Sequence, residues 1–240
     1  MKLAIFSDIH ANFHALDAVL ENASQQGCTH FICLGDIVGY NAFPSECLAR
    51  IRSIASAVVK GNHDEQASML GEQDGFNPLA EEAINWTREQ LSEPDKDWLR
   101  ALRLQRQVRD FTIVHATLDT PHKWGYIFNQ LDAASSFNYQ ITPFCFIGHT
   151  HSPKAFVRDG AVRVIPFDEI LPQAGKKYLV NVGSVGQPRD GDPRAAYVTF
   201  DTGNGIIKLH RVTYDVWAAQ KAIIAAGLPK SLADRLAVGK

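Results

Sequence analysis

The chain has 240 residues, of which 45% are hydrophobic and 21% charged, a balance that supports a sizeable core and excludes a disordered or collagen-like protein. Lysine and arginine number 24 against 26 aspartates and glutamates, and the net charge of -2 excludes a global basic field for nucleic acid or anionic membranes. Any affinity for phosphate must therefore come from a local site, and we expect residues 1–240 to form one domain.

The cysteines form no Cys-x-x-Cys pair and lie in apolar or mixed segments, at Cys28, Cys33, Cys47 and Cys145. We expect reduced, buried thiols rather than disulfides or zinc ligands. Asp8 interrupts the N-terminal apolar segment too early for a signal peptide, and no run of about 18 apolar residues predicts a membrane helix. We therefore expect a cytoplasmic protein with no membrane partner.

Short apolar runs rich in β-branched and aromatic residues alternate with segments of helical spacing, which is typical of an α/β fold. The first helix is expected to begin at Asn12 and to end at Gly27, and the second to begin at Ser45, just after Pro44. The runs predicted as buried strands are residues 2–6, 30–34, 57–59, 111–114, 144–147 and 178–182.

The pattern becomes mostly helical between residues 77 and 102, with Pro78 at a helix start and a break at Ser92-Glu93-Pro94. We interpret residues 65–105 as a helical, cap-like insertion over the active face, and about residues 215–240 as a helical tail whose main helix spans 216–226. Two hairpins are predicted between these regions, pairing residues 154–157 with 161–165 and residues 195–200 with 206–212.

Five of the predicted strands end in side chains that can bind a metal ion. In chain order these are Asp8 and His10, then Asp36, then Asn62, then His115, and finally His149 and His151. Ligands of α/β sheets bind beyond the carboxyl ends of the strands, so we expect these side chains to converge. A glycine precedes Asp36, Asn62 and His149, and we expect each to let the backbone turn sharply.

The spacing of these residues adds to the pattern. Asp8 and His10 are two positions apart, as are His149 and His151, and in an extended segment such residues point to the same side. Each residue alone is more often a structural polar group, but their joint occurrence predicts a metal site. The histidines without such a placement are His14, His30, His122 and His210.

The candidate ligands are two carboxylates, four imidazoles and one amide, which suit Mn²⁺, Fe, Zn²⁺ or Co²⁺ better than Ca²⁺ or Mg²⁺. Because so many donors exceed the needs of one ion, we predict two divalent ions. With only two anionic side chains, such a cluster keeps a positive charge and attracts anions. A phosphate ester is the anion that two-metal hydrolysis handles best.

The ordered series Asp8-x-His10, Gly35-Asp36, Gly61-Asn62-His63-Asp64, His115 and Gly148-His149-x-His151 resembles the calcineurin-like metallophosphoesterases over residues 1 to about 200. Residues 35–40 and 183–190 resemble the small bacterial branch that holds phosphodiesterases and dinucleoside polyphosphate hydrolases. The resemblance implies a four-layer αββα sandwich. It also implies two divalent ions, with Mn²⁺ as the first expectation and Fe, Zn²⁺, Co²⁺ or Ni²⁺ as alternatives.

The resemblance further implies the roles of the site residues. One ion would be held by Asp8, His10 and His151, the other by Asn62, His115 and His149, with Asp36 bridging and a bridging hydroxide attacking phosphorus. His63 would act as general acid or charge stabiliser for the leaving oxygen, the alternative being a solvent-facing loop histidine. Asp64 would either orient His63 or cap the following turn.

The sequence departs from the family in two places. Protein phosphatases of the superfamily carry an Asp-Arg-Gly whose arginine binds phosphate, and the corresponding positions here are Gly39, Tyr40 and Asn41. This departure argues against a phosphoprotein phosphatase. Ala11 stands where the family usually has glycine, a small change that we expect to leave the metal site intact.

Arg189, beside Gln187, is the candidate replacement for the missing phosphate-binding arginine, because a guanidinium binds phosphate through two hydrogen bonds. The alternative for Arg189 is a surface ion pair with Asp190 or Asp192. Tyr40 would either stack on a base of the substrate or pack internally, and packing is the favoured interpretation.

The main hypothesis is a cytoplasmic, dinuclear phosphoesterase that hydrolyses a phosphodiester or phosphoanhydride of a small molecule or nucleotide. The alternatives are a phosphomonoesterase or protein phosphatase, a non-catalytic metal-dependent scaffold, and a redox enzyme. His63 argues against the scaffold, and a redox enzyme would need a cofactor loop or cysteine chemistry that the sequence lacks. Oligomeric state leaves no readable mark.

A series of arginines does not change this interpretation. It crosses from a helix into a predicted strand without interleaved aromatic residues, so we expect a solvated edge rather than a nucleic-acid surface. The series comprises Arg100, Arg103, Arg106 and Arg109.

Overall fold

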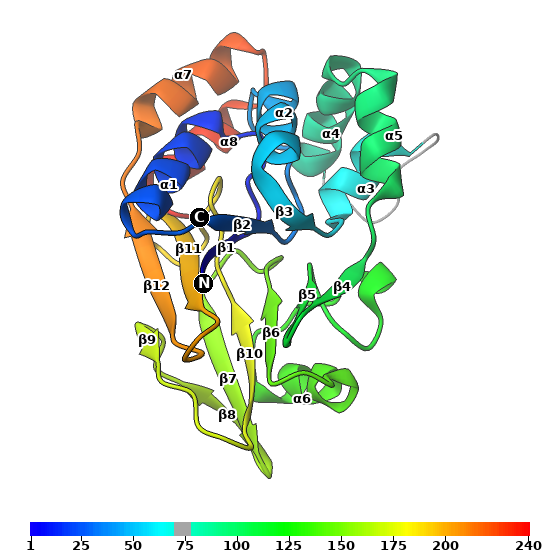
Figure 1. Cartoon of the computed structure of the whole chain (residues 1–240). Coiled ribbons are helices and arrows are strands. Elements are labelled where there is room, and N and C mark those ends of the chain that lie inside the picture. The colour runs from blue at the N-terminus through cyan, green and yellow to red at the C-terminus, as the bar shows by residue number, and fades with distance from the viewer. Residues whose placement is uncertain (70–77) are drawn as a thin grey trace.

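The structure is a computed structural model that describes residues 1–69 and 78–240. The described residues form two six-stranded sheets packed face to face, with helices on both outer sides (Figure 1). In the first sheet β1, β2 and β3 run parallel, so their carboxyl ends lie at one edge. Its order is β3 (Ala55–Val58), β2 (His30–Cys33), β1 (Lys2–Phe6), β11 (Ala195–Asp201), β12 (Ile207–Val212) and β9 (Glu169–Ile170).

The second sheet contains a parallel set of its own, formed by β5, β6 and β10. Its order is β4 (Gln105–Val108), β5 (Phe111–Val114), β6 (Phe144–Ile147), β10 (Lys177–Asn181), β7 (Lys154–Asp159) and β8 (Ala161–Ile165). Every predicted strand and both predicted hairpins are present, with ends that differ by one or two residues. Two of the described strands were not among the predicted apolar runs or hairpins. β4 is mostly polar and exposed, and β9 has only two residues.

Apolar side chains hold the layers together. Between the sheets, residues such as Ile5 and Phe146 form one buried cluster. A second cluster packs α1 (Phe13–Gln25) and α2 (Pro44–Ile54) on the outer face of the first sheet. A third packs α6 (Gln130–Tyr139) on the outer face of the second sheet. The predicted four-layer αββα sandwich is confirmed.

The helix ends follow local chemistry. Asn12 caps α1, accepting a hydrogen bond from the Ala15 backbone N–H at 3.1 Å, and Gly27 follows the helix with a φ of 78°. The second helix begins at Pro44 rather than at Ser45 as predicted. Proline occupies the first helical position here because its fixed φ suits the helix and its missing N–H would have no partner within the helix.

The predicted insertion contains α3 (Asn62–Ser68), α4 (Pro78–Gln90) and α5 (Glu93–Ala101), with Ser92 capping α5 at the expected break. The helix start expected at Pro78 is confirmed, and residue 77, where the helical pattern was predicted to begin, lies outside the described residues. Leu99 of α5 belongs to the buried cluster that also contains residues of α1 and α2. Ala80 and Ala83 of α4 pack with Tyr40, so α4 borders the ligand-bearing loops. That the insertion caps the active face stays a prediction.

The helical tail consists of α7 (Val216–Ala225), α8 (Lys230–Asp234) and the short 3-10 helix η2 (Arg235–Ala237), and it joins the cluster around Tyr40. Each cysteine is free and buried, as expected. Across residues 1–69 and 78–240, none of the helices has both the length and the apolar character needed to traverse a bilayer.

The core between the sheets gives a first prediction. Phe146 is fully buried and its ring lies 5.6 Å from that of Phe111 and 5.2 Å from that of Phe200. Phe146→Ala should lower the free energy of unfolding by about 3–5 kcal/mol, measured by urea denaturation, because it leaves a cavity. Ile141→Ala is the control, because Ile141 is 77% exposed and its truncation should change stability by less than about 0.5 kcal/mol. Equal effects of the two substitutions would contradict this account.

Candidate metal centre

The structure brings the predicted ligands to one edge of the sandwich. The loops after β1, β2, β5 and β6 carry Asp8 and His10, Asp36, His115, and His149 and His151, respectively. Asn62 opens α3 directly after β3, between Gly61 and His63, and the His63 backbone N–H donates to Asp36 Oδ1 at 2.8 Å. The candidate ligands therefore come from both sheets.

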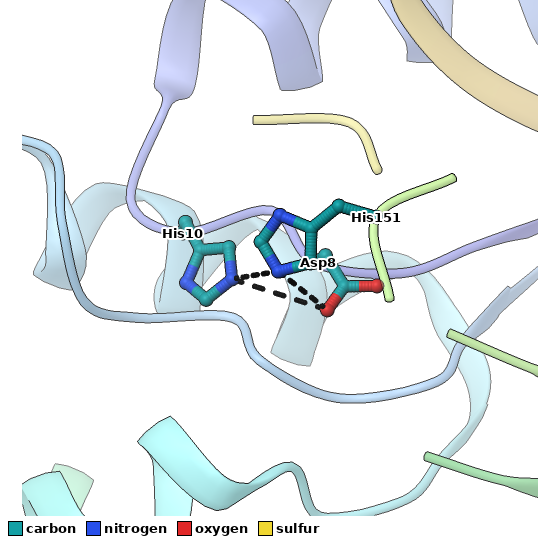
Figure 2. A group of neighbouring side chains, drawn as sticks. All are labelled: Asp8, His10 and His151. Carbon is teal, nitrogen blue, oxygen red and sulfur yellow. Dashed lines mark hydrogen bonds and ion pairs between the residues drawn. The ribbon is translucent and has the colours of Figure 1, made fainter. Parts of the chain in front are cut away.

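One group consists of Asp8, His10 and His151, which point toward one another in Figure 2. His151 Nε2 lies 3.3 Å and His10 Nε2 3.9 Å from Asp8 Oδ1. The two Nε2 atoms are 3.1 Å apart. All three side chains are buried, so their polar atoms face one another rather than solvent.

A second group consists of Asp36, His115 and His149. His115 Nε2 lies 3.3 Å from Asp36 Oδ2 and 3.2 Å from His149 Nδ1. Asp36 Oδ2 is also 3.6 Å from His10 Nε2, so this carboxylate adjoins both groups. Asn62 Oδ1 is buried and has no hydrogen-bond partner among the described residues, which leaves its lone pairs for a cation.

The hydrogen bonds on the outer side of each imidazole fix which nitrogen faces inward. His10, His115 and His151 each direct Nδ1 at a backbone carbonyl, of Val38, Leu34 and Gln187 respectively, at 3.1, 2.9 and 2.6 Å. His149 is reversed, with Nε2 directed at the Trp124 carbonyl at 2.8 Å. Because a carbonyl only accepts, each of these nitrogens is the donor, and the inward nitrogen of a neutral ring carries a lone pair.

Burial and charge act on these groups together. Burial lowers the pKa of His10 and His151 well below the usual range and lowers that of His149 to about 3. Burial opposes the charged form of His115 too, but the carboxylates of Asp36 and Asp8 outweigh it and raise the pKa of His115 to about 9. Most of the inward nitrogens are therefore lone pairs beside carboxylates, an arrangement that fits divalent cations.

The backbone of the ligand loops corrects one prediction. The i, i+2 pairs do not lie in extended segments, because the ligands adopt left-handed backbone angles. Their φ values are 53° for Asp8, 47° for His10, 50° for Asp36, 68° for His149 and 57° for His151. Such conformations are strained for residues other than glycine and are typical of functional sites. His149 and His151 consequently reach different groups.

The glycines before the ligands also differ from expectation. Gly35 does have a left-handed φ of 94°, as a sharp turn requires. Gly61 has an ordinary φ of -100°, and a Cβ there would collide with the Asp36 carboxylate. A Cβ at Gly148 would collide with Ser7 and Asp8. These two glycines provide space for the ligands rather than a turn.

His63 forms a third, overlapping group of candidate ligands with His10 and Asp36, and its ring centroid is 4.7 Å from that of His10 and 4.4 Å from that of Tyr40. The ring is buried rather than facing solvent, and burial lowers the pKa of His63 to about 4. Asp64 binds backbone amides, with Oδ1 accepting from Ile37 N–H at 2.8 Å and Oδ2 from Gly61 N–H at 3.1 Å. Its contacts are those of a cap that also holds the Asp36 loop.

Arg189 contacts Gln187 and Tyr40. Asp190 pairs with Arg211 and Asp192 with Arg194, so the suggested ion pair of Arg189 with either aspartate is not formed. The arginine donates instead to Gln187 Oε1 at 2.7 Å, and its guanidinium lies 5.6 Å from the centre of the Tyr40 ring. Tyr40 is 6% exposed, in line with the packing role.

The loop between β5 and α6 contacts the site, although no sequence pattern predicted it. Trp124 accepts the outer hydrogen bond of His149, and its own indole donates to Glu65 Oε2 at 3.2 Å. Tyr126 stacks on His149, with ring centroids 4.2 Å apart. The loop contains only the short 3-10 helix η1 (Pro121–Lys123), so no periodic pattern marks it.

Comparisons with known proteins agree with this geometry. The sequence model of the family described as "Calcineurin-like phosphoesterase superfamily domain" matches residues 1–205. The chain is 37% identical over 244 residues to "Uncharacterized protein MJ0912" of Methanocaldococcus jannaschii, covering 99% of this chain and 98% of that protein. It is similar to the solved structure of a metallophosphoesterase from Sphaerobacter thermophilus, with a TM-score of 0.90, 39% identity, and coverage of 100% of this chain and 99% of that one. The hypothetical protein PH1004 from Pyrococcus horikoshii OT3 shares the fold, with a TM-score of 0.79, 19% identity, and coverage of 100% and 98%.

The geometry predicts the effect of removing one candidate ligand. His151→Ala should weaken Mn²⁺ binding by at least about tenfold in titration calorimetry, because it removes a lone pair from the Asp8 group. His122→Ala is the matched control, since His122 is exposed and belongs to no ligand group. An unchanged Mn²⁺ affinity in His151→Ala would contradict the assignment.

Proposed function

Since the chain belongs to the calcineurin-like phosphoesterase superfamily, we propose that it is a dinuclear metallophosphoesterase that hydrolyses a phosphodiester or phosphoanhydride of a small molecule or nucleotide. The observation that carries the proposal is the pair of buried ligand groups that adjoin the single carboxylate of Asp36. The free, buried cysteines support a cytoplasmic location.

The chain offers a ligand set for each of two ions. Asp8, His10 and His151 would hold one, and Asn62, His115 and His149 the other, with Asp36 shared between them. When bound, two divalent ions supply a nucleophilic water of lowered pKa and stabilise the charge that develops on the phosphoryl oxygens. Mn²⁺ is our first choice of metal, because imidazole and oxygen donors suit it, and Fe, Zn²⁺, Co²⁺ and Ni²⁺ are the alternatives.

His63 would stabilise the leaving oxygen. Burial lowers the pKa of His63 to about 4, so its imidazole is neutral near pH 7 and acts by donating a hydrogen bond from a ring N–H. A metal cation nearby would lower the pKa of His63 further and would therefore also keep the imidazole neutral. By holding the Asp36 loop, Asp64 would position the shared carboxylate and His63 rather than take part in proton transfer.

Arg189 would bind a non-bridging oxygen of the substrate phosphate. Gln187 supports this role, because its Oε1 accepts hydrogen bonds from the guanidinium while its backbone carbonyl orients His151. The Arg189 guanidinium, 5.6 Å from the centre of the Tyr40 ring, gives this side of the site a positive charge suited to a phosphate ester or anhydride.

Hydrolysis of bis(p-nitrophenyl) phosphate tests the proposed activity. Metal-stripped protein given Mn²⁺ should release p-nitrophenol, and His63→Gln should lower kcat by about 100-fold with its metal content unchanged. His14→Gln is the control, because His14 lies outside the ligand groups. The proposal fails if Mn²⁺, Co²⁺, Ni²⁺ and Zn²⁺ all give no turnover.

The shared position of Asp36 predicts a distinct metal stoichiometry. Asp36→Asn should lose both ions together, as measured by elemental analysis after dialysis, because each ion would lose an anionic ligand. Asp17→Asn changes an exposed aspartate and should keep both. One ion retained at full occupancy in Asp36→Asn would refute the bridging role.

A further inference from the structure

A pair of exposed aromatic rings lies beside the candidate metal centre. The ring of Tyr126 stacks on the His149 imidazole, with planes 22° apart. The rings of Tyr126 and Phe128 are 5.4 Å apart and within 4° of parallel. We refer to Tyr126 and Phe128 as the aromatic ledge.

The aromatic ledge leaves much of its surface open to solvent. Tyr126 is 51% exposed and Phe128 54% exposed, although rings of this size are usually buried. Both have flat faces, and together they adjoin a polar site lined by buried ligands. An exposed apolar surface in this position is typical of a surface that binds the organic part of a ligand.

Hydrogen bonds between side chains and the backbone hold the segment that carries the aromatic ledge. Asp132 Oδ2 accepts from the Phe128 N–H at 2.9 Å, and Lys154 Nζ donates to the Phe128 carbonyl at 2.8 Å. On the other side of the ledge, the Trp124 carbonyl accepts from His149. The backbone that carries the two rings is therefore held in place before a ligand arrives, which lowers the entropic cost of binding.

The aromatic ledge lies within reach of the groups that would bind phosphate. The Tyr126 ring stacks on His149, and His149 Nδ1 lies 3.2 Å from His115 Nε2 in the Asp36 group. The stacked rings of His149, Tyr126 and Phe128 thus form a row that begins at a candidate ligand and ends at an exposed apolar ring. A nucleotide has the same order of parts, with a charged phosphate at one end and a flat base at the other.

We propose that the aromatic ledge stacks on the nucleobase of a nucleotide substrate whose phosphate lies at the metal centre. This inference rests on the proposed phosphoesterase function and narrows its substrate class to nucleotide esters or anhydrides. Every base has a π-face, so the ledge recognises a base as a class rather than one base. Phe128 is the residue that tests this role, because Tyr126 also contacts a candidate ligand.

The test compares the binding of AMP and ribose 5-phosphate to the Mn²⁺-loaded protein by titration calorimetry. The two compounds share phosphate and sugar, and only AMP has a base. AMP should bind about tenfold more tightly. Phe128→Ala and Phe128→Leu should each reduce this ratio to about two or less, because neither side chain has a π-face. Phe128→Trp should retain the ratio.

Tyr139→Ala is the matched control, because Tyr139 is an aromatic residue at the last position of α6 and is 62% exposed. The ratio should stay near tenfold in this variant. The inference is overturned if the wild-type protein does not prefer AMP, or if Phe128→Ala keeps the preference. An unchanged ratio with an altered oligomeric state in Phe128→Ala would make the ledge an interface between copies of the chain.

The binding ratio needs no turnover, so the two proposals fail separately. Absence of bis(p-nitrophenyl) phosphate hydrolysis would count against the phosphoesterase function, whereas loss of the AMP preference would count only against the aromatic ledge.

Discussion

The hydrogen bonds between four imidazoles and four backbone carbonyls are the constraint on which the candidate site depends. The carbonyls of Leu34, Val38, Trp124 and Gln187 each take the N–H of one histidine. Three of the rings are neutral near pH 7 and present a lone pair inward, toward carboxylates and other lone pairs, and His115, whose pKa is raised to about 9, does so once it loses its inward proton. Acceptors gathered in this way repel one another in a buried site, and a cation relieves that repulsion. The positions of these backbone carbonyls therefore set which ring nitrogens are available to bind metal ions.

This arrangement has a conformational cost that the rest of the fold offsets. Asp8, Asp36 and His149 hold left-handed backbone angles that cost of order 1–3 kcal/mol each. Gly61 and Gly148 remove the side-chain carbon that would collide with neighbouring carboxylates. Strain of this kind persists only where the surrounding structure determines the loop conformation, and the three apolar clusters of the sandwich provide that support.

The sequence predicted what depends on local pattern. Strands such as 144–147 are short apolar runs, and the residues that follow them are the candidate ligands, so strand ends and ligands could be found together. What it could not predict depends on distant partners. The pairing of Asp190 with Arg211 joins residues 21 positions apart, and Arg189 donates to Gln187 instead. The aromatic ledge lies in a loop without periodicity, and the left-handed angles of His10 and His151 arise from loop packing rather than residue type.

The groups around Asp8 and around Asp36 with His115 have a mechanical consequence, because each of these two draws from both halves of the sandwich. Asp8 and His10 come from the first sheet and His151 from the second, while Asp36 comes from the first and His115 and His149 from the second. A cation in either group would therefore fasten the two sheets to each other, much as a crosslink does. Its affinity for the folded chain would add to the free energy of unfolding. Separation of the sheets and release of the ions would then be one event.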